Sequence, residues 1–238
     1  MSHFLILKLD GPMQAWGDHT FEDFRPSSDF PLRSGLLWLL AACLGIERGD
    51  SEAQTQLAGS VEFTVRADQA TIRRELDGKT ASRRAAKLKD YHTVIEARRV
   101  NRRPKEGETI QTWREYLYDA HFTVAVGQRD GAVISLDEIE YALRNPVYTP
   151  SLGRRSCPLA RPLLDRESKD VMVEAESGIA ALAKMPPTGG LIYAETPSEQ
   201  GKPIAVRDIP MHRKKRQFAT RKVYVHKEQE AVDVHQPD

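Results

Sequence analysis

Basic side chains gather in two short segments of this 238-residue sequence. Residues 72–103 hold 11 basic and 4 acidic side chains, and residues 207–222 hold 7 and 1, although the formal net charge of the whole chain is only +1. Such segregation indicates a polyanion held at a defined place, with ordinary surface elsewhere. For the second segment, which includes Arg213, Arg216 and Arg221, an ordinary surface loop is an equally good interpretation.

The first basic segment combines paired arginines with an aromatic residue. Arg83-Arg84 precedes Asp90-Tyr91-His92-Thr93, and Arg98-Arg99 and Arg102-Arg103 follow. Guanidinium groups fit phosphate oxygens, and an adjacent ring can stack on an unpaired base. The combination therefore favours binding of single-stranded nucleic acid. The alternative is a solvated hairpin without a ligand.

Two other places offer groups that bind anions. In Leu152-Gly153-Arg154-Arg155, glycine allows a close backbone approach and the paired arginines can hold phosphates. The alternative there is a turn with exposed arginines. Ser34 resembles an N-cap before an apolar run, so Arg33-Ser34 predicts a helix start whose free N–H groups attract phosphate. An ordinary helix cap explains that pattern equally well.

The first segment also contains residue types that can cleave RNA without a metal. His92 lies beside Tyr91, with Lys89 nearby; one group would accept the 2′-OH proton and another would stabilise the phosphorane charge. One such pair is weak evidence, so cleavage stands as the alternative to binding. We find no ligand spacing for zinc, no two-metal site and no Walker A motif, and we expect no cofactor and no metal.

The predicted elements that position these residues follow a familiar order. We predict strands over 4–9, 61–66 and 121–126, and helices over 35–44 and 135–144. The order strand, helix, strand, insertion, strand, helix is the ferredoxin-like βαββαβ plan of an α+β fold, with the basic segment inserted between the second and third strands.

The remaining segments have weaker sequence patterns. Residues 13–33, which include Trp16 and Arg25, have no clear period and predict a long functional loop. Further strands are expected at 190–194, or nearer 171–173, and at 223–226. Cys43 and Trp38 fall on the apolar helix and are predicted to lie in the core.

The composition also excludes several classes of protein. The sequence has no apolar run of about 18 residues and no basic leader followed by a long apolar stretch, so we expect neither a membrane span nor a secretion signal. Two cysteines are too few for a disulfide scaffold. A cytoplasmic protein is the expectation.

Seven stretches of the sequence carry a family resemblance, and they fall between about residues 4 and 226: 9–17 (LDGPMQAWG), 30–37 (FPLRSGLL), 42–46 (ACLGI), 90–94 (DYHTV), 108–117 (ETIQTWREYL), 148–159 (YTPSLGRRSCPL) and 216–219 (RQFA). Together they resemble the Cas5 family of CRISPR-associated proteins, in the branch that belongs to the type I-E Cascade complex.

This resemblance implies an RRM-like palm over 1–70 and 115–160, a basic thumb insertion over 71–114 and a smaller β-rich C-terminal region over 161–238. It implies a non-catalytic subunit that binds the 5′ handle of the CRISPR RNA and caps one end of the complex. Its partners would be the backbone subunit CasC and the large subunit CasA, with target DNA met only through the complex. In this branch CasE cuts the guide. A sibling branch cuts repeat RNA with Tyr, Lys and His, so a metal-independent endoribonuclease is the alternative.

The same resemblance, taken with the residue chemistry, gives a set of expected RNA contacts. Arg98, Arg99, Arg102 and Arg103 would contact RNA from the thumb, Tyr91 and His92 from its base, Arg33, Ser34, Arg154 and Arg155 from the palm, Trp16 and Arg25 from the long loop, and Arg213, Arg216 and Arg221 would contact RNA or a subunit.

Overall fold

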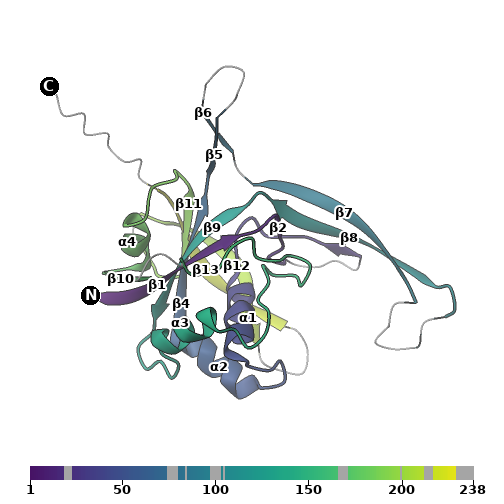
Figure 1. Ribbon diagram of the computed structural model, residues 1–238, viewed down its shortest axis with the longest axis horizontal. Helices are drawn as coiled ribbons and strands as arrows, with labels where there is room; N and C mark the ends of the chain where they lie inside the picture. The colour runs from purple at the N-terminus through teal and green to yellow at the C-terminus, as the bar shows by residue number, and fades with distance from the viewer. Residues whose placement is uncertain are drawn as a thin grey trace.

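A seven-stranded antiparallel sheet organises the chain in a computed structural model (Figure 1). The structure describes residues 1–18, 23–73, 80–83, 85–96, 103, 105–165, 171–198, 200–211 and 217–228, with backbone alone at 70–73 and 80–83. The strand order is β10-β1-β9-β4-β11-β13-β12. The chain is therefore an α+β protein dominated by antiparallel pairing.

The strands of this sheet come from the whole length of the chain. Their bounds are β1 (Ser2–Asp10), β4 (Val61–Asp68), β9 (His121–Gln128), β10 (Met172–Ala175), β11 (Leu191–Ala194), β12 (Lys202–Met211) and β13 (Gln217–Lys227). The helices are α1 (Arg33–Leu44), α2 (Ser51–Ser60), α3 (Leu136–Arg144) and α4 (Gly178–Ala183). Residues after 160 thus supply β10 to one edge and β11, β13 and β12 to the other. None of the helices in the described ranges has the length and apolar character to cross a bilayer.

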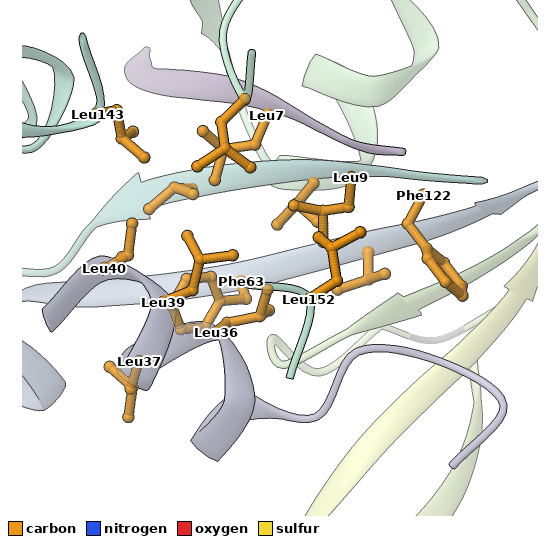
Figure 2. Close-up of a cluster of buried hydrophobic side chains, with 14 of the residues drawn as sticks. Leu7, Leu9, Leu36, Leu37, Leu39, Leu40, Phe63, Phe122, Leu143 and Leu152 are labelled. Atoms are coloured by element: carbon orange, nitrogen blue, oxygen red, sulfur yellow. The ribbon is translucent and has the colours of Figure 1, made fainter. Parts of the chain in front are cut away.

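The alternation of β1 divides the core between the two faces of the sheet. Leu5, Leu7 and Leu9 are fully buried and belong to the large cluster that includes α1 and α3 (Figure 2). Phe4 and Ile6 point to the opposite face, where they belong to a smaller cluster with α4. Period-two side-chain direction in a strand explains this division.

Two hairpins are inserted between β4 and β9, which pair directly with each other. The first is β5 (Ala70–Arg73) with β6 (Thr80–Arg83). The second is the long pair β7 (Ala86–Ile95) and β8 (Thr109–Tyr118), which projects away from the seven-stranded sheet (Figure 1). Two short strands also pair with β8: β2 (Met13–Gln14) at its root and β3 (Phe24–Arg25) at its middle.

Most predicted elements are confirmed. The strands over 4–9, 61–66 and 121–126 form, and both later candidates, 190–194 and 171–173, appear as β11 and β10. The capping box of Ser135 and Glu138 opens α3 as predicted. The helix α2 was not predicted, since its sequence has little apolar periodicity.

Three local predictions are wrong. Helix α1 begins at Arg33 after Leu32, which has no side-chain cap, so Ser34 is a helical residue and not the N-cap. Trp38 is 39% exposed and does not belong to the core, because it lies on the outer side of α1. The loop over 13–33 contains β2 and β3. Cys43 is buried as predicted, and burial raises the pKa of its thiol to about 11.

A buried arginine links β4 to the residue that follows β13. Arg66 of β4 is fully buried, with Nε 2.6 Å from Asp68 Oδ1 and Nη1 2.6 Å from Glu228 Oε1. The other Glu228 oxygen accepts hydrogen bonds from the N–H groups of 188–190. Both carboxylates compensate the buried guanidinium charge, as a buried ion needs.

Candidate nucleic-acid interface

The long β7–β8 hairpin separates its side chains onto two faces. Lys89 and Tyr91 lie on one face of β7, and Asp90 and His92 lie on the other, because successive side chains of a strand alternate. Tyr91 pairs in register with Trp113 of β8. Tyr91 and His92 were expected to act together at the thumb base, but they point in opposite directions.

One face of the hairpin exposes aromatic rings. Tyr91 is 51% exposed and Trp113 is 38% exposed, and their ring centroids are 5.5 Å apart with planes tilted by 50°. Phe24 of β3 pairs in register with Trp113 on the other side of β8. Lys89 Nζ lies 5.0 Å from the centroid of the Phe24 ring.

The other face of the hairpin carries charged side chains. Arg114 of β8 pairs in register with Asp90 of β7 and with Arg25 of β3. His92 Nε2 lies 2.6 Å from Asp90 Oδ2. Arg25 is exposed, and its guanidinium has no hydrogen bond or ion pair with any residue that the structure describes. This face can therefore approach phosphate oxygens through Arg25 and Arg114.

The Gly153-Arg154-Arg155 loop is attached to the root of this hairpin. Arg154 donates hydrogen bonds of 2.9 Å to the carbonyl oxygens of Glu115 and Arg25, and its guanidinium lies 4.7 Å from the Tyr116 ring centroid. Arg154 thus links the loop to the hairpin by hydrogen bonds and a ring contact. Arg155 is exposed, and among the described residues its side chain has no bonded partner.

The close approach made by Gly153 is internal. Its φ is +88°, and a Cβ there would lie 1.8 Å from the Ala15 carbonyl oxygen. Glycine was expected to let the backbone approach a ligand, but here it lets the loop pass the backbone of the chain itself. Gly153 therefore permits a close backbone approach as predicted, but to Ala15 of the same chain, where a ligand was expected.

The predicted phosphate seat at the start of α1 is filled from within the chain. The Arg33 N–H donates 2.7 Å to Asp208 Oδ2. The Arg33 side chain is buried, with Nη1 2.5 Å from Glu195 and Nη2 donating to the carbonyl oxygens of Ala58 and Val61. An internal carboxylate thus occupies the positive end of the helix dipole, where an external phosphate was expected.

Two more expected contacts also point inward. Arg221 donates to both oxygens of Asp208 at 2.6 and 2.7 Å, and its side chain is 13% exposed. Burial opposes the Arg221 charge, but hydrogen bonds to Asp208 and the charges of Glu195 and Asp208 raise its pKa. Trp16 is 2% exposed, and its indole Nε1 donates 3.0 Å to Gln14 Oε1. Trp16 therefore belongs to the core and offers no face to a base.

The other expected contacts divide between described and undescribed parts of the chain. Ser34 is half-buried in the first turn of α1, and Arg103 is exposed. Five expected contacts lie outside the described residues: Arg98, Arg99, Arg102, Arg213 and Arg216.

Lys89, Tyr91 and His92 do not converge on one point. Lys89 and Tyr91 share the aromatic face, whereas His92 faces the opposite side beside Asp90. Within the described ranges, no group of three or more His, Cys, Asp or Glu side chains is arranged to hold a metal ion.

Sequence reasoning missed Phe24, Trp113 and Arg114. Trp113 and Arg114 belong to a stretch quoted only for its resemblance, and its strand period over 109–118 was the signal available. Phe24 could not be placed, because its pairing with β8 joins segments almost 90 residues apart.

A family model described as "CRISPR-associated protein (Cas_Cas5)" matches residues 4–224 of the chain. The chain belongs to the Cas5 family. The "CRISPR system Cascade subunit CasD" of Escherichia coli K12 is 48% identical to this Cas5-family chain over 227 residues, covering 94% of the chain and 96% of the relative.

Solved structures agree with the Cas5 assignment. A chain of a "CRISPR RNA-guided surveillance complex" matches with a TM-score of 0.69 and 26% identity, covering 94% of this chain and 89% of that one. A structure titled "Crystal structure of Cas protein" matches with a TM-score of 0.57 and 24% identity over 94% and 93% of the two chains, and shows a shared fold. The family resemblance seen in the sequence is thereby confirmed.

Proposed function

We propose that this Cas5-family chain is a non-catalytic RNA-binding subunit of a type I-E CRISPR Cascade complex. It binds the repeat-derived 5′ handle of the CRISPR RNA, caps one end of the complex beside CasC and CasA, meets target DNA through the complex and serves antiviral defence in the cytoplasm. The 48% identity to a Cascade subunit supports the assembly. The projecting β7–β8 hairpin, with exposed rings on one face and arginines on the other, is the observation that carries RNA binding.

The palm of this proposal is ferredoxin-like. Its chain order is β1, α1, β4, β9, α3, β10, and its sheet order β10-β1-β9-β4 is the antiparallel order of the βαββαβ plan. The thumb over 71–114 is then the insertion between β4 and β9. The fourth palm strand, β10, comes from the region over 161–238, whose other strands extend the palm sheet beyond β4.

The proposed RNA contacts among the described residues of the hairpin and its root are Arg25, Arg114, Arg155 and Tyr91, whose side chains are exposed or half-buried. The thumb arginines Arg98, Arg99, Arg102 and Arg103 belong to the same proposal. Ser34, His92, Arg213 and Arg216 stay in the set as predictions. Arg33, Arg221 and Trp16 leave it, because their functional groups are buried against internal partners. Arg154 acts indirectly by holding the loop that presents Arg155.

The placement of the three candidate catalytic residues supports a non-catalytic role. Lys89 and Tyr91 lie on one face of β7 and His92 lies on the other, so the three do not converge as a general acid–base set would. Binding needs no such convergence.

The test is recovery of RNA and subunits with the tagged full-length chain from cells that express the other Cascade subunits. We expect CasC, CasA and RNAs that begin with the repeat-derived handle. Replacement of residues 92–112 by Asn-Gly keeps the hairpin root and removes the distal arginines, and we expect it to lower RNA recovery without changing the melting temperature. Arg48→Ala, an exposed arginine between α1 and α2, is the control.

Recovery of the subunits without handle RNA, or full RNA recovery with the shortened hairpin, would contradict RNA binding by this element. Recovery of neither RNA nor subunits by the unaltered chain would contradict the assignment to Cascade.

A further inference from the structure

We infer that Phe24, Trp113 and Tyr91 form a stacking platform for unpaired bases of single-stranded RNA. This inference rests on the proposed function and specifies one of its contact surfaces. The three rings belong to three adjacent strands, β3, β8 and β7, and the strand registers place them in one row.

The register argument places the rings together without reference to any ligand. Phe24 pairs with Trp113, and Trp113 pairs with Tyr91, so all three side chains leave the same face of the sheet. Neighbouring strands lie about 4.8 Å apart, so the row spans about 10 Å. Sheets of RNA-recognition modules stack two or three bases on aromatic side chains carried in this way.

The exposure of these rings is the second observation. Trp113 is 38% exposed and Tyr91 is 51% exposed, whereas Tyr116 and Leu117, which follow on β8, are buried at the hairpin root. Phe24 is half-buried beside Trp113. Tyr118, at the end of β8, is also exposed. Two exposed rings beside a half-buried one on a projecting element mark a binding surface.

The charges on this face favour RNA over an apolar protein segment. Lys89 Nζ lies over the Phe24 ring, at 5.0 Å from its centroid. Lys87 of the same face pairs with Asp29 at 2.9 Å and lies 3.9 Å from Glu115. The acidic groups thus have a lysine partner, and Lys89 adds a positive charge among the rings. Rings beside a cation suit bases that are joined by phosphates.

The arginines on the opposite face can contact phosphates independently of the rings. Arg25 and Arg114 are the register neighbours that follow Phe24 and Trp113, and they point to the other side of the sheet. Phosphate contacts and base stacking are therefore separable by mutation, because no residue of the ring row belongs to the arginine row.

The experiment measures binding of a fluorescently labelled single-stranded handle RNA to the full-length chain and to the reconstituted complex. Trp113→Leu removes the central ring, and Trp113→Phe keeps an aromatic ring. Trp38→Leu is the matched control, because Trp38 is 39% exposed on α1, away from the hairpin. Tyr91→Leu is a second variant in case Trp113→Leu does not fold.

We expect about tenfold weaker binding for Trp113→Leu, within the range of ring-to-alanine losses at stacked bases. We expect most of the affinity to return in Trp113→Phe and no change in Trp38→Leu. The salt dependence of binding should stay the same in all three, because stacking releases no counterions. Quenching of Trp113 fluorescence by the RNA, absent from Trp113→Phe, should accompany binding.

Unchanged RNA affinity of the Trp113→Leu and Tyr91→Leu variants would overturn the platform, and if Arg25→Ala still weakened binding, the proposed function would stand. Unchanged RNA affinity with loss of assembly would show that a protein segment covers this face, which also overturns the platform. If the unaltered chain binds no handle RNA, alone or in the complex, the proposed function fails with it.

Discussion

Asp208→Asn should destabilise the protein strongly, because it leaves a buried guanidinium without its main anionic partner. Asp208 is 1% exposed and accepts hydrogen bonds from the Arg33 N–H and from two nitrogens of Arg221. The substitution keeps the volume and an oxygen for the Arg33 N–H. It removes the negative charge that compensates the Arg221 guanidinium.

The expected loss of unfolding free energy depends on the anionic partner that Arg221 keeps. Removal of one member of a buried ion pair costs about 3–5 kcal/mol. We expect the lower end, about 3 kcal/mol, because Glu195 Oε1 stays 3.5 Å from Arg221 Nη1. For a chain of this size that corresponds to a fall in melting temperature of about 6–12 °C.

Thermal and urea unfolding measure this loss, with Asp29→Asn as control. Asp29 pairs with Lys87 at the surface, its side chain is 74% exposed, and its substitution should change stability by less than about 1 kcal/mol. Arg221→Met in the Asp208→Asn background should cost less than the sum of the single changes, because it removes the orphaned charge. If Asp208→Asn melts within about 2 °C of the parent, the internal role given to Arg221 is wrong.

Three other predictions concern RNA contacts, cleavage and pH. The double variant Arg25→Ala with Arg155→Ala should have a shallower slope of log binding constant against log salt concentration, by about 0.7 for each phosphate that it no longer binds. Its melting temperature should not change. An unchanged slope would refute both contacts. His92→Ala should leave repeat-RNA processing unchanged in cells that contain CasE, and RNA cleavage by the purified parent that this variant lacks would support the enzyme alternative. Glu228→Gln should destabilise the chain at neutral pH: burial opposes the charge of Glu228, but hydrogen bonds from the Thr188 N–H and its neighbours lower its pKa below 4.5. The stabilisation by the Glu228 carboxylate is present at pH values above its unfolded-state pKa of 4.5 and is lost as the pH falls through the folded-state pKa. In urea unfolding, the difference in unfolding free energy between the Glu228→Gln variant and the parent should therefore shrink in acid.

The elements of the palm could be predicted because their signals are local. Alternation over 61–66, an apolar run over 4–9 and the capping box at Ser135 each lie within a few residues of the element that they specify. The presence of an insertion after β4 followed from the change in composition after residue 71. The helix α2 has no comparable signal.

The site could be predicted only in part because its deciding contacts are long-range. The side chain of Arg33 meets Glu195, and its N–H meets Asp208, 162 and 175 residues away. A sequence shows the charge of Arg33 but not the acid that neutralises it, so a buried arginine and a phosphate-binding arginine look alike. Trp16 was predicted to line the RNA groove for the same reason. The contacts that bury it come from residues further along the chain: the Ser27 hydroxyl accepts from its N–H, and Gly35 lies against its ring.

The side-chain faces of the hairpin were within reach of the sequence, but only in part. Alternation already puts Tyr91 and His92 on opposite faces of any strand that contains both. The row of Phe24, Trp113 and Tyr91 depends on two strand registers that turn geometry and packing decide.

The central claim is that the 5′ handle of the guide lies on the β7–β8 hairpin and its root. Ultraviolet crosslinking of the purified complex, with the crosslinked peptides and nucleotides identified by mass spectrometry, tests it most directly. We expect crosslinks from handle nucleotides to peptides that contain Tyr91, Trp113 or Arg155. Handle crosslinks that fall only on other subunits, or crosslinks of these peptides only to the spacer part of the guide, would contradict it.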